Sequence, residues 1–170
     1  FNTEKLLDLN AWYIRESSDK FLMEQSIPFL RKLGIPEPDE AILKEIIPHL
    51  KARSKTLVEM AEGAKFCFDE EIQYEQKGDD KFLKTGVAPL LDNLVDALEK
   101  TNPFDQDNLE KTFISFLEEN EIKLRKLAQP LRVALTGKTA SPGIFEVMQV
   151  LGKEKVVDRI RKAVDHINAK

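Results

Sequence analysis

The sequence predicts an all-α protein made of two small helical subdomains, with no significant β-sheet. Apolar residues recur at helical spacing along nearly the whole chain, and no convincing strand alternation interrupts them. The composition, 42% hydrophobic and 33% charged over 170 residues, is typical of a globular protein with a real core. A polar, acidic stretch at 68–80 contains Gly78 and separates two helical halves, so we expect subdomains at 1–75 and 76–170.

The first half is expected to contain four helices. Apolar periodicity places them at about 6–14, 21–30, 38–50 and 56–61. Pro28 should bend or interrupt the second of these helices, and Gly34 should end it. Pro38, followed by two acidic residues, suits the first turn of the third helix.

The second half is expected to contain five helices, at about 87–98, 107–117, 123–136, 142–151 and 156–164. Asp107 and Glu110 have the spacing of a capping box ahead of an apolar run. The helix at 123–136 is basic. No internal repeat is visible.

Cellular context follows from what the sequence contains and lacks. No apolar run approaches the roughly 20 residues that span a bilayer, and no signal peptide is visible. Cys67 is the single cysteine, so an internal disulfide is impossible; we expect a buried thiol and a cytoplasmic protein without a membrane partner. The chain starts with Phe1 instead of Met, which suggests a start inside a longer chain.

The charge is unevenly distributed. The net charge is −4, but residues 1–120 have a balance of −10 and residues 121–170 have a balance of +6. A basic end on an acidic body is compatible with a polyanion such as RNA. Basic residues that only solvate helix faces would give the same pattern, so the charge alone leaves both interpretations open.

Several kinds of catalytic or metal site are not supported. His49 and His166 have no cysteine or carboxylate at ligand spacing, so no metal site is expected. The Gly137-Lys138-Thr139 run resembles the end of a phosphate-binding loop, but Arg132 stands where that loop needs its first glycine. We find no nucleophile–base constellation, and we therefore expect no catalytic residue in this chain.

The stretch from Gln129 to Glu146 is the most informative part of the chain. Gly137 is suited to end one helix in the left-handed conformation, and Ser141 and Pro142 should cap and begin the next. Arg132, about one turn before the loop, could stack on a base or hydrogen-bond its edge. The alternative is an ordinary helical corner in which Arg132 pairs with an acid on a neighbouring helix.

The same stretch resembles the end of bacterial-type glutamyl-tRNA synthetases, which are class I aminoacyl-tRNA synthetases. The likeness lies in the Pro-Leu-Arg-Val-Ala-Leu-Thr-Gly run at 130–137, in Ser-Pro-Gly-Ile-Phe-Glu at 141–146 and in Leu-Gly-Lys-Glu at 151–154. The segments at 1–13 and 50–57 resemble the beginning and middle of the helical region of that family.

The resemblance implies a parent ligase that attaches glutamate to tRNA(Glu) with ATP and Mg²⁺ in protein biosynthesis. The catalytic motifs of the family, similar to His-Ile-Gly-His and Lys-Met-Ser-Lys-Ser, are not in this sequence. The chain therefore resembles the family's anticodon-binding helical bundle, or α-helix cage. We expect it to need no cofactor of its own, to bind the anticodon arm of tRNA(Glu) and to be a monomer.

The resemblance also assigns site residues. Arg132 matches the arginine that meets the first anticodon base, and Ser141, Pro142 and Ile144 match the loop and helix start around it. The family often has Thr in place of Ser141 and Leu in place of Ile144. Arg53 matches an arginine associated with reading the third anticodon base, which favours discrimination of tRNA(Glu) from tRNA(Gln).

Further contacts with phosphate are expected on the basic helix and in the loop. Lys123, Arg125 and Lys126 stand where relatives often have a Lys-x-Gly pattern, here without the glycine, so the local backbone is expected to differ. Lys138 and Thr139 add a cation and a hydroxyl in the loop. Each cation that faces phosphate would make binding salt-dependent.

An all-helical protein-interaction module with no RNA role is the alternative function. Such a module would dock partners on exposed apolar helix faces. Burial of the apolar residues in the second half would count against it, namely Leu90, Leu94, Leu98, Phe113 and Phe116.

Overall fold

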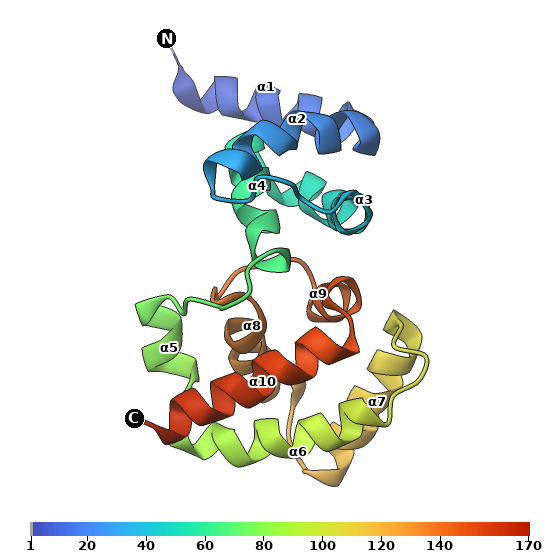
Figure 1. Ribbon diagram of the computed structural model, residues 1–170, viewed down its shortest axis with the longest axis vertical. Coiled ribbons are helices and arrows are strands. Elements are labelled where there is room, and N and C mark those ends of the chain that lie inside the picture. Colours follow the sequence, from blue (N-terminus) through green and yellow to red (C-terminus); the bar gives the residue numbers. More distant parts are fainter. Residues whose placement is uncertain (1) are drawn as a thin grey trace. The chain divides into compact units, whose positions relative to one another are not determined.

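The computed structural model describes residues 2–170 and confirms the all-α prediction: ten α-helices form, and these residues contain no strand (Figure 1). Phe1, where the resemblance to the synthetase family begins, lies outside the described residues. The chain divides into two compact units, Phe1–Glu70 and Glu71–Lys170. The structure groups residues 71–75 with the second unit, whereas the predicted division into RNA-binding subdomains at 75/76 stays a prediction.

The first unit contains four α-helices and two short 3₁₀ turns. The helices are α1 (Thr3–Glu16), α2 (Asp19–Lys32), α3 (Glu40–Leu50) and α4 (Leu57–Ala64), and the turns are η1 (Lys51–Arg53) and η2 (Lys65–Cys67). Its core lies between α2, α3 and α4 and consists of fully buried aliphatic side chains, including Leu22, Leu30, Leu43, Ile46, Ile47 and Met60. Each such side chain contributes roughly 1.5–3 kcal/mol through burial.

Side-chain caps begin the helices of this unit. Ser18 accepts a hydrogen bond from Phe21 N, Asp39 accepts from Ala41 N and Ile42 N, and Thr56 accepts from Glu59 N. Each cap satisfies backbone N–H groups that have no partner within the helix. Asp39 is therefore the cap of α3, and Pro38 precedes the helix instead of lying in its first turn.

Two details of the first half differ from a simple amphipathic pattern. Pro28 lies inside α2, which continues past it to Lys32 before Gly34 adopts a positive φ of 91°. The apolar residues of α1 are mostly at the surface: Leu6, Leu9, Trp12 and Tyr13 are about half exposed, while Ala11 and Ile14 are buried. Cys67 is buried, as predicted.

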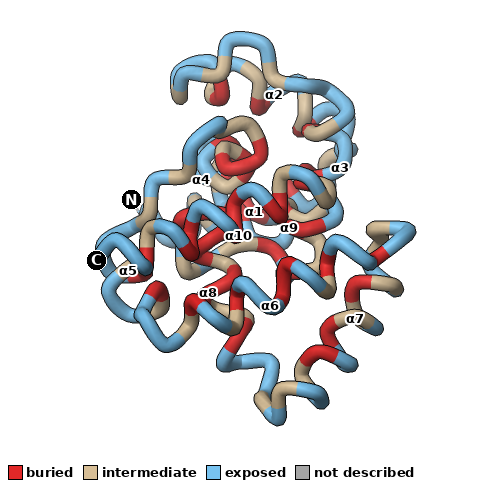
Figure 2. Tube along the Cα trace, turned by 60° about the horizontal axis from the view of Figure 1, so that its bottom comes forward, coloured by how far each residue is buried: buried red, intermediate tan, exposed pale blue. Residues whose placement is uncertain are grey.

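The second unit contains six α-helices and one 3₁₀ turn. These are α5 (Gln76–Phe82), η3 (Thr85–Val87), α6 (Ala88–Glu99), α7 (Gln106–Glu119), α8 (Leu124–Thr136), α9 (Ile144–Leu151) and α10 (Lys153–Asn168). Figure 1 shows α10 running beside α6, the most extensive contact between two helices of the unit. Buried residues recur along one side of α6 and of α7 (Figure 2).

One predicted cap in this unit was wrong, and one helix was not predicted. The cap of α7 is Asp105 instead of Asp107, because the Asp105 carboxylate accepts a hydrogen bond from Asn108 N at 2.9 Å. The acidic stretch at 68–80, which was predicted to separate the two helical halves, contains the start of α5 at Gln76, a helix that was not predicted. Helix α5 was missed because it is short and polar, and its buried member is Gly78, which adds nothing to an apolar pattern.

Candidate nucleic-acid interface

The candidate interface is the corner between α8 and α9, residues 132–144. Helix α8 ends at Thr136, and Gly137 follows in the left-handed conformation with a φ of 77°, as predicted. Its N–H donates to Val133 O at 2.8 Å, which satisfies one of the last carbonyls of the helix. The Thr136 hydroxyl donates to Arg132 O at 2.8 Å and accepts from Lys138 N at 3.1 Å, so it ties the loop to the helix end.

The structure brings Arg132 and Ser141 together across this corner. Arg132 Nε donates to Ser141 Oγ at 2.8 Å, and the Ser141 hydroxyl donates to Pro142 O at 2.7 Å. The Nε–H bond lies in the plane of the guanidinium, so fixing its direction restricts the orientation of the whole group. The corner therefore presents an arginine whose orientation is set by the loop that follows it.

The predicted cap of the next helix is wrong. Helix α9 begins at Ile144 with Gly143 as its N-cap residue, so Ser141 does not cap it and Pro142 is not its first residue. The Ser141 hydroxyl is already engaged by Arg132 and Pro142 O. Instead, Glu146 Oε2 accepts a hydrogen bond from Gly143 N at 3.0 Å.

The segment Ile72–Gly78 packs against the corner and supports it. Glu75 N donates to Gly137 O at 2.8 Å. A Cβ at Gly137 would lie 2.2 Å from Gln73 O, and a Cβ at Gly78 would lie 3.2 Å from both the Val133 and Thr139 side chains. Gly137 is thus needed for the close approach of two chain segments, and a side chain at Gly78 would displace Val133 or Thr139 by a few tenths of an ångström. Sequence reasoning missed the role of Gly78, for which the only signal was a glycine inside a polar run.

Helix α10 supports the same corner from another side. Arg159 is 3% exposed, and its Nη1 donates to Leu135 O at 2.7 Å. Leu135 lies in the last turn of α8, where backbone carbonyls lack partners within the helix. This buried arginine is therefore part of the scaffold of the corner, a role that its place in a basic C-terminal region did not reveal.

The remaining predicted residues occupy different environments. Pro142 and Ile144 are buried, so their side chains shape the corner from inside. Thr139 is partly buried against Gly78, and Lys138 is exposed. Arg53 is exposed at the end of η1 in the first unit.

The basic residues around α8 and on α10 differ in their partners. On and after α8, Lys123, Arg125, Lys126 and Lys138 are exposed, and no carboxylate of residues 2–170 lies within 4.0 Å of their side-chain nitrogens. On α10, Arg161 pairs with Glu99 at 2.7 Å and Lys162 pairs with Glu71 at 2.8 Å. The start of α8 and the loop after it thus carry exposed cations without acidic partners, whereas Arg161 and Lys162 of α10 are paired.

The described residues offer little for other kinds of site. No set of three or more His, Cys, Asp or Glu residues among them is arranged to hold a metal ion. None of their helices combines the length and apolar character that a membrane crossing requires.

The fold and corner define an all-helical module with a cation-lined arginine corner. A family model described as an anticodon binding domain matches residues 21–164. The chain belongs to this anticodon-binding domain family.

Its relatives specify the family member. The chain is 42% identical over 167 residues to the glutamate–tRNA ligase of Geobacter sulfurreducens, a match that covers 98% of this chain and 36% of the relative. It is 41% identical over 169 residues to glutamate–tRNA ligase 1 of Syntrophus aciditrophicus, with 99% and 36% covered. The chain thus spans about a third of the length of these relatives and is homologous to their C-terminal part.

Solved structures show the same fold. A glutamate tRNA ligase from Elizabethkingia meningosepticum, solved with its amino acid, matches with a TM-score of 0.87 and 23% identity. The match covers 98% of this chain and 33% of that one. A glutamate–tRNA synthetase from Elizabethkingia anophelis matches with a TM-score of 0.81, also at 23% identity, with 97% and 32% covered.

Proposed function

We propose that this chain grips the anticodon arm of tRNA(Glu) as part of a monomeric, cytoplasmic glutamate–tRNA ligase. In the parent enzyme, glutamate is activated with ATP and Mg²⁺ and transferred to tRNA by residues outside this chain, which needs no cofactor for its own role. The observation that carries the proposal is the group of exposed cations without acidic partners beside the Arg132–Ser141 corner. Phosphates of the anticodon arm would meet these cations, while the corner meets the bases.

Arg132 is proposed to read the first anticodon base. Single-stranded bases are read by stacking and by hydrogen bonds to their edges, and a guanidinium of fixed plane can do both. The hydrogen bond from Arg132 Nε to Ser141 restricts the orientation of that group. Ser141, Pro142 and Ile144 shape the loop around the base, while Lys123, Arg125, Lys126, Lys138 and Thr139 contact phosphate.

Arg53 is proposed to read the third anticodon base and thereby to discriminate tRNA(Glu) from tRNA(Gln). Its exposed side chain directly precedes Ser54, a buried residue between η1 and α4. An exposed arginine at the end of a 3₁₀ turn can reach an unstacked base and stack on it or hydrogen-bond its edge.

The alternative function, a protein-interaction module without an RNA role, loses its main support. Leu94, Leu98, Phe113 and Phe116 are at most 4% exposed, and Leu90 is partly buried. These apolar residues form the core of the second unit instead of a docking face.

Filter binding of tRNA(Glu) at fixed salt tests the first-base assignment. Arg132→Ala should weaken binding by about 1–3 kcal/mol, as expected for loss of a bidentate base contact. Arg161→Ala is the matched control, because it removes the same charge from an exposed arginine that pairs with Glu99. Binding by Arg132→Ala as tight as that of the unmodified chain would contradict the assignment.

A tRNA variant at the third anticodon base tests the role of Arg53. The unmodified chain should prefer the tRNA(Glu) base, and Arg53→Gln should lose that preference. Arg15→Gln, at an exposed arginine in the last turn of α1, should retain it. An unmodified chain that is indifferent to the third base would refute discrimination by this chain.

A further inference from the structure

One face of α10 holds the segment 71–83 through three basic side chains spaced four residues apart. Lys162 Nζ pairs with Glu71 Oε1 at 2.8 Å, His166 Nε2 lies 2.9 Å from both carboxylate oxygens of Asp79, and Lys170 Nζ donates to Leu83 O at 2.7 Å. Residues four apart lie on the same face of a helix, and Lys170 continues that face just beyond the helix end.

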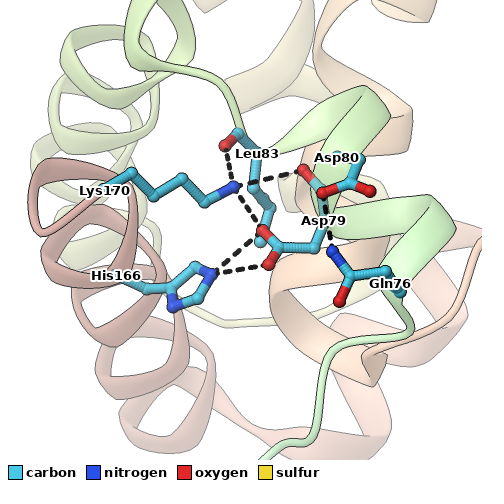
Figure 3. Close-up of polar contacts among 6 residues, drawn as sticks. All are labelled: Gln76, Asp79, Asp80, Leu83, His166 and Lys170. Atoms are coloured by element: carbon cyan, nitrogen blue, oxygen red, sulfur yellow. Dashed lines mark hydrogen bonds and ion pairs between the residues drawn. The ribbon is translucent and has the colours of Figure 1, made fainter.

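Asp79 is the centre of this arrangement. Figure 3 shows its carboxylate between His166 and Lys170, both of which contact it. The Asp79 side chain is only 15% exposed. Burial alone would raise the pKa of Asp79, but hydrogen bonds from Lys170 and His166 outweigh burial and hold that pKa below its ordinary value. The carboxylate is therefore ionised at neutral pH.

The segment that α10 holds is the same segment that packs against the α8–α9 corner. His166 also stacks at a tilt on Tyr74, with ring centroids 4.7 Å apart, so it contacts the chain on both sides of Glu75. Glu75 N donates to Gly137 O, and Gly78 lies against the side chains of Val133 and Thr139. The segment Tyr74–Asp79 is thus enclosed between the end of α10 and the α8–α9 corner.

We propose that Asp79 and His166 are positioning residues for RNA binding, which rests on the function proposed above. Their contact holds the segment Tyr74–Asp79 in place, the segment fixes Gly137 and the loop after it, and Ser141 in that loop orients Arg132. Neither Asp79 nor His166 touches RNA in this account. They act on base recognition through the backbone that carries the recognising arginine.

The sign of one charge change separates this role from ordinary electrostatics. Removal of an acidic group from a polyanion-binding protein favours binding when charge alone matters. Asp79→Asn should instead weaken binding, because the segment loses its hold on the corner. Asp80→Asn is a matched control on the same helix, since the Asp80 carboxylate accepts from Gln76 and not from α10 (Figure 3).

The experiment measures binding of an anticodon stem-loop RNA and of a stem-loop with a changed first anticodon base, each over a salt series. Asp79→Asn should lose about tenfold in affinity for the unchanged RNA, equivalent to about 1.4 kcal/mol. It should lose less for the changed RNA, and its salt dependence should stay the same because no phosphate contact is removed. Asp80→Asn should stay within about twofold of the unmodified chain, on the same scale.

Hydrogen exchange of single amides provides a second readout, which separates local loosening at the corner from destabilisation of the whole unit. In Asp79→Asn the Glu75 amide, which bonds Gly137, should exchange faster, while the core amide of Leu94 should not change. His166→Gln keeps a donor for Asp79 and should bind RNA more tightly than His166→Ala. Equal acceleration at Glu75 and Leu94, or equal loss in both His166 variants, would overturn the positioning role.

The outcomes distinguish this inference from the proposed function. The proposed function fails, and the inference fails with it, if the unmodified chain binds both RNAs equally well. The same holds if Arg132→Ala binds the unchanged RNA as tightly as the unmodified chain binds it. If both behave as proposed but Asp79→Asn and Asp80→Asn bind alike, only the positioning role is overturned.

Discussion

Helices α8 and α10 are both rich in basic residues, yet they use them in opposite ways. The first turn of α8 and the residue before it carry Lys123, Arg125 and Lys126, all exposed and without an acidic partner in the described chain. The cations of α10 interact with the protein itself: Arg161 and Lys162 pair with acids, and Arg159 is buried against Leu135 O. A count of charges cannot distinguish these helices, whereas the pairing of the charges does.

Paired and unpaired cations also contribute differently to the stability of the fold. Exposed ion pairs such as Arg161–Glu99 contribute about 0–1 kcal/mol to stability, because solvent screens them and ordering two long side chains costs entropy. Cations that face no acid contribute nothing of this kind and repel one another. Their clustering at the start of α8 is the feature that the proposed contact with tRNA phosphates would explain.

The largest expected effect concerns the support of the α8–α9 corner. Gly137→Ala should lower the free energy of unfolding by about 2–3 kcal/mol, from the left-handed backbone and the lost Glu75 N to Gly137 O hydrogen bond. Urea denaturation measures the change. Gly86→Ala, where a Cβ would meet no atom within 4 Å, is the control and should change stability far less. If Gly137→Ala left the chain as stable as before, the close approach of Gln73 would be refuted.

The next effect concerns Asp79, whose carboxylate is held by His166 of α10 and by Lys170. Because the pKa of Asp79 is lowered in the folded chain, its ionised form contributes stability above the ordinary value of 3.8, and this contribution is lost as the pH falls through the lower folded value. The stability gap between the unmodified chain and Asp79→Asn should thus be full at neutral pH and shrink in acid below pH 3.8. Urea titrations over this range measure the gap. A stability difference that grows as the pH falls would contradict a stabilising role for the contacts of Asp79 with His166 and Lys170.

The smallest effect is expected on the exposed face of α10. Arg161→Ala should change the free energy of unfolding by less than about 1 kcal/mol, as exposed ion pairs usually do. Thermal denaturation at low and high salt measures it, and the small difference should vanish at high salt. A loss that persists at high salt would show that Arg161 has a structural role beyond its ion pair.

The sequence predicts the helices because each buries a regular apolar face. The repeat from Leu91 to Leu98 and the apolar run of the last helix gave correct elements for this reason. The ends of helices were less predictable, because several polar residues compete for each cap. Asp105, and not Asp107, accepts the capping hydrogen bond of α7. The Ser141 hydroxyl bonds Arg132 and does not cap α9.

The candidate site could be predicted only in its local part. Gly137 and its loop carry a local signal, and Arg132 precedes them by one turn. The contact between Asp79 and His166 could not be predicted, because the two residues are 87 positions apart and neither stands in a recognisable pattern. A polar residue that acts across a tertiary contact leaves no periodic trace in the sequence.

The most direct test of the account compares the two basic helices by the salt dependence of tRNA binding. Each lost phosphate contact should lower the slope of log K against log salt by about 0.7–0.9. Lys123→Ala with Lys126→Ala should therefore flatten the slope by about 1.5, while Arg161→Ala with Lys162→Ala leaves it unchanged. The reverse result, an unchanged slope for the α8 pair and a flattened slope for the α10 pair, would contradict the assignment of the RNA-facing side.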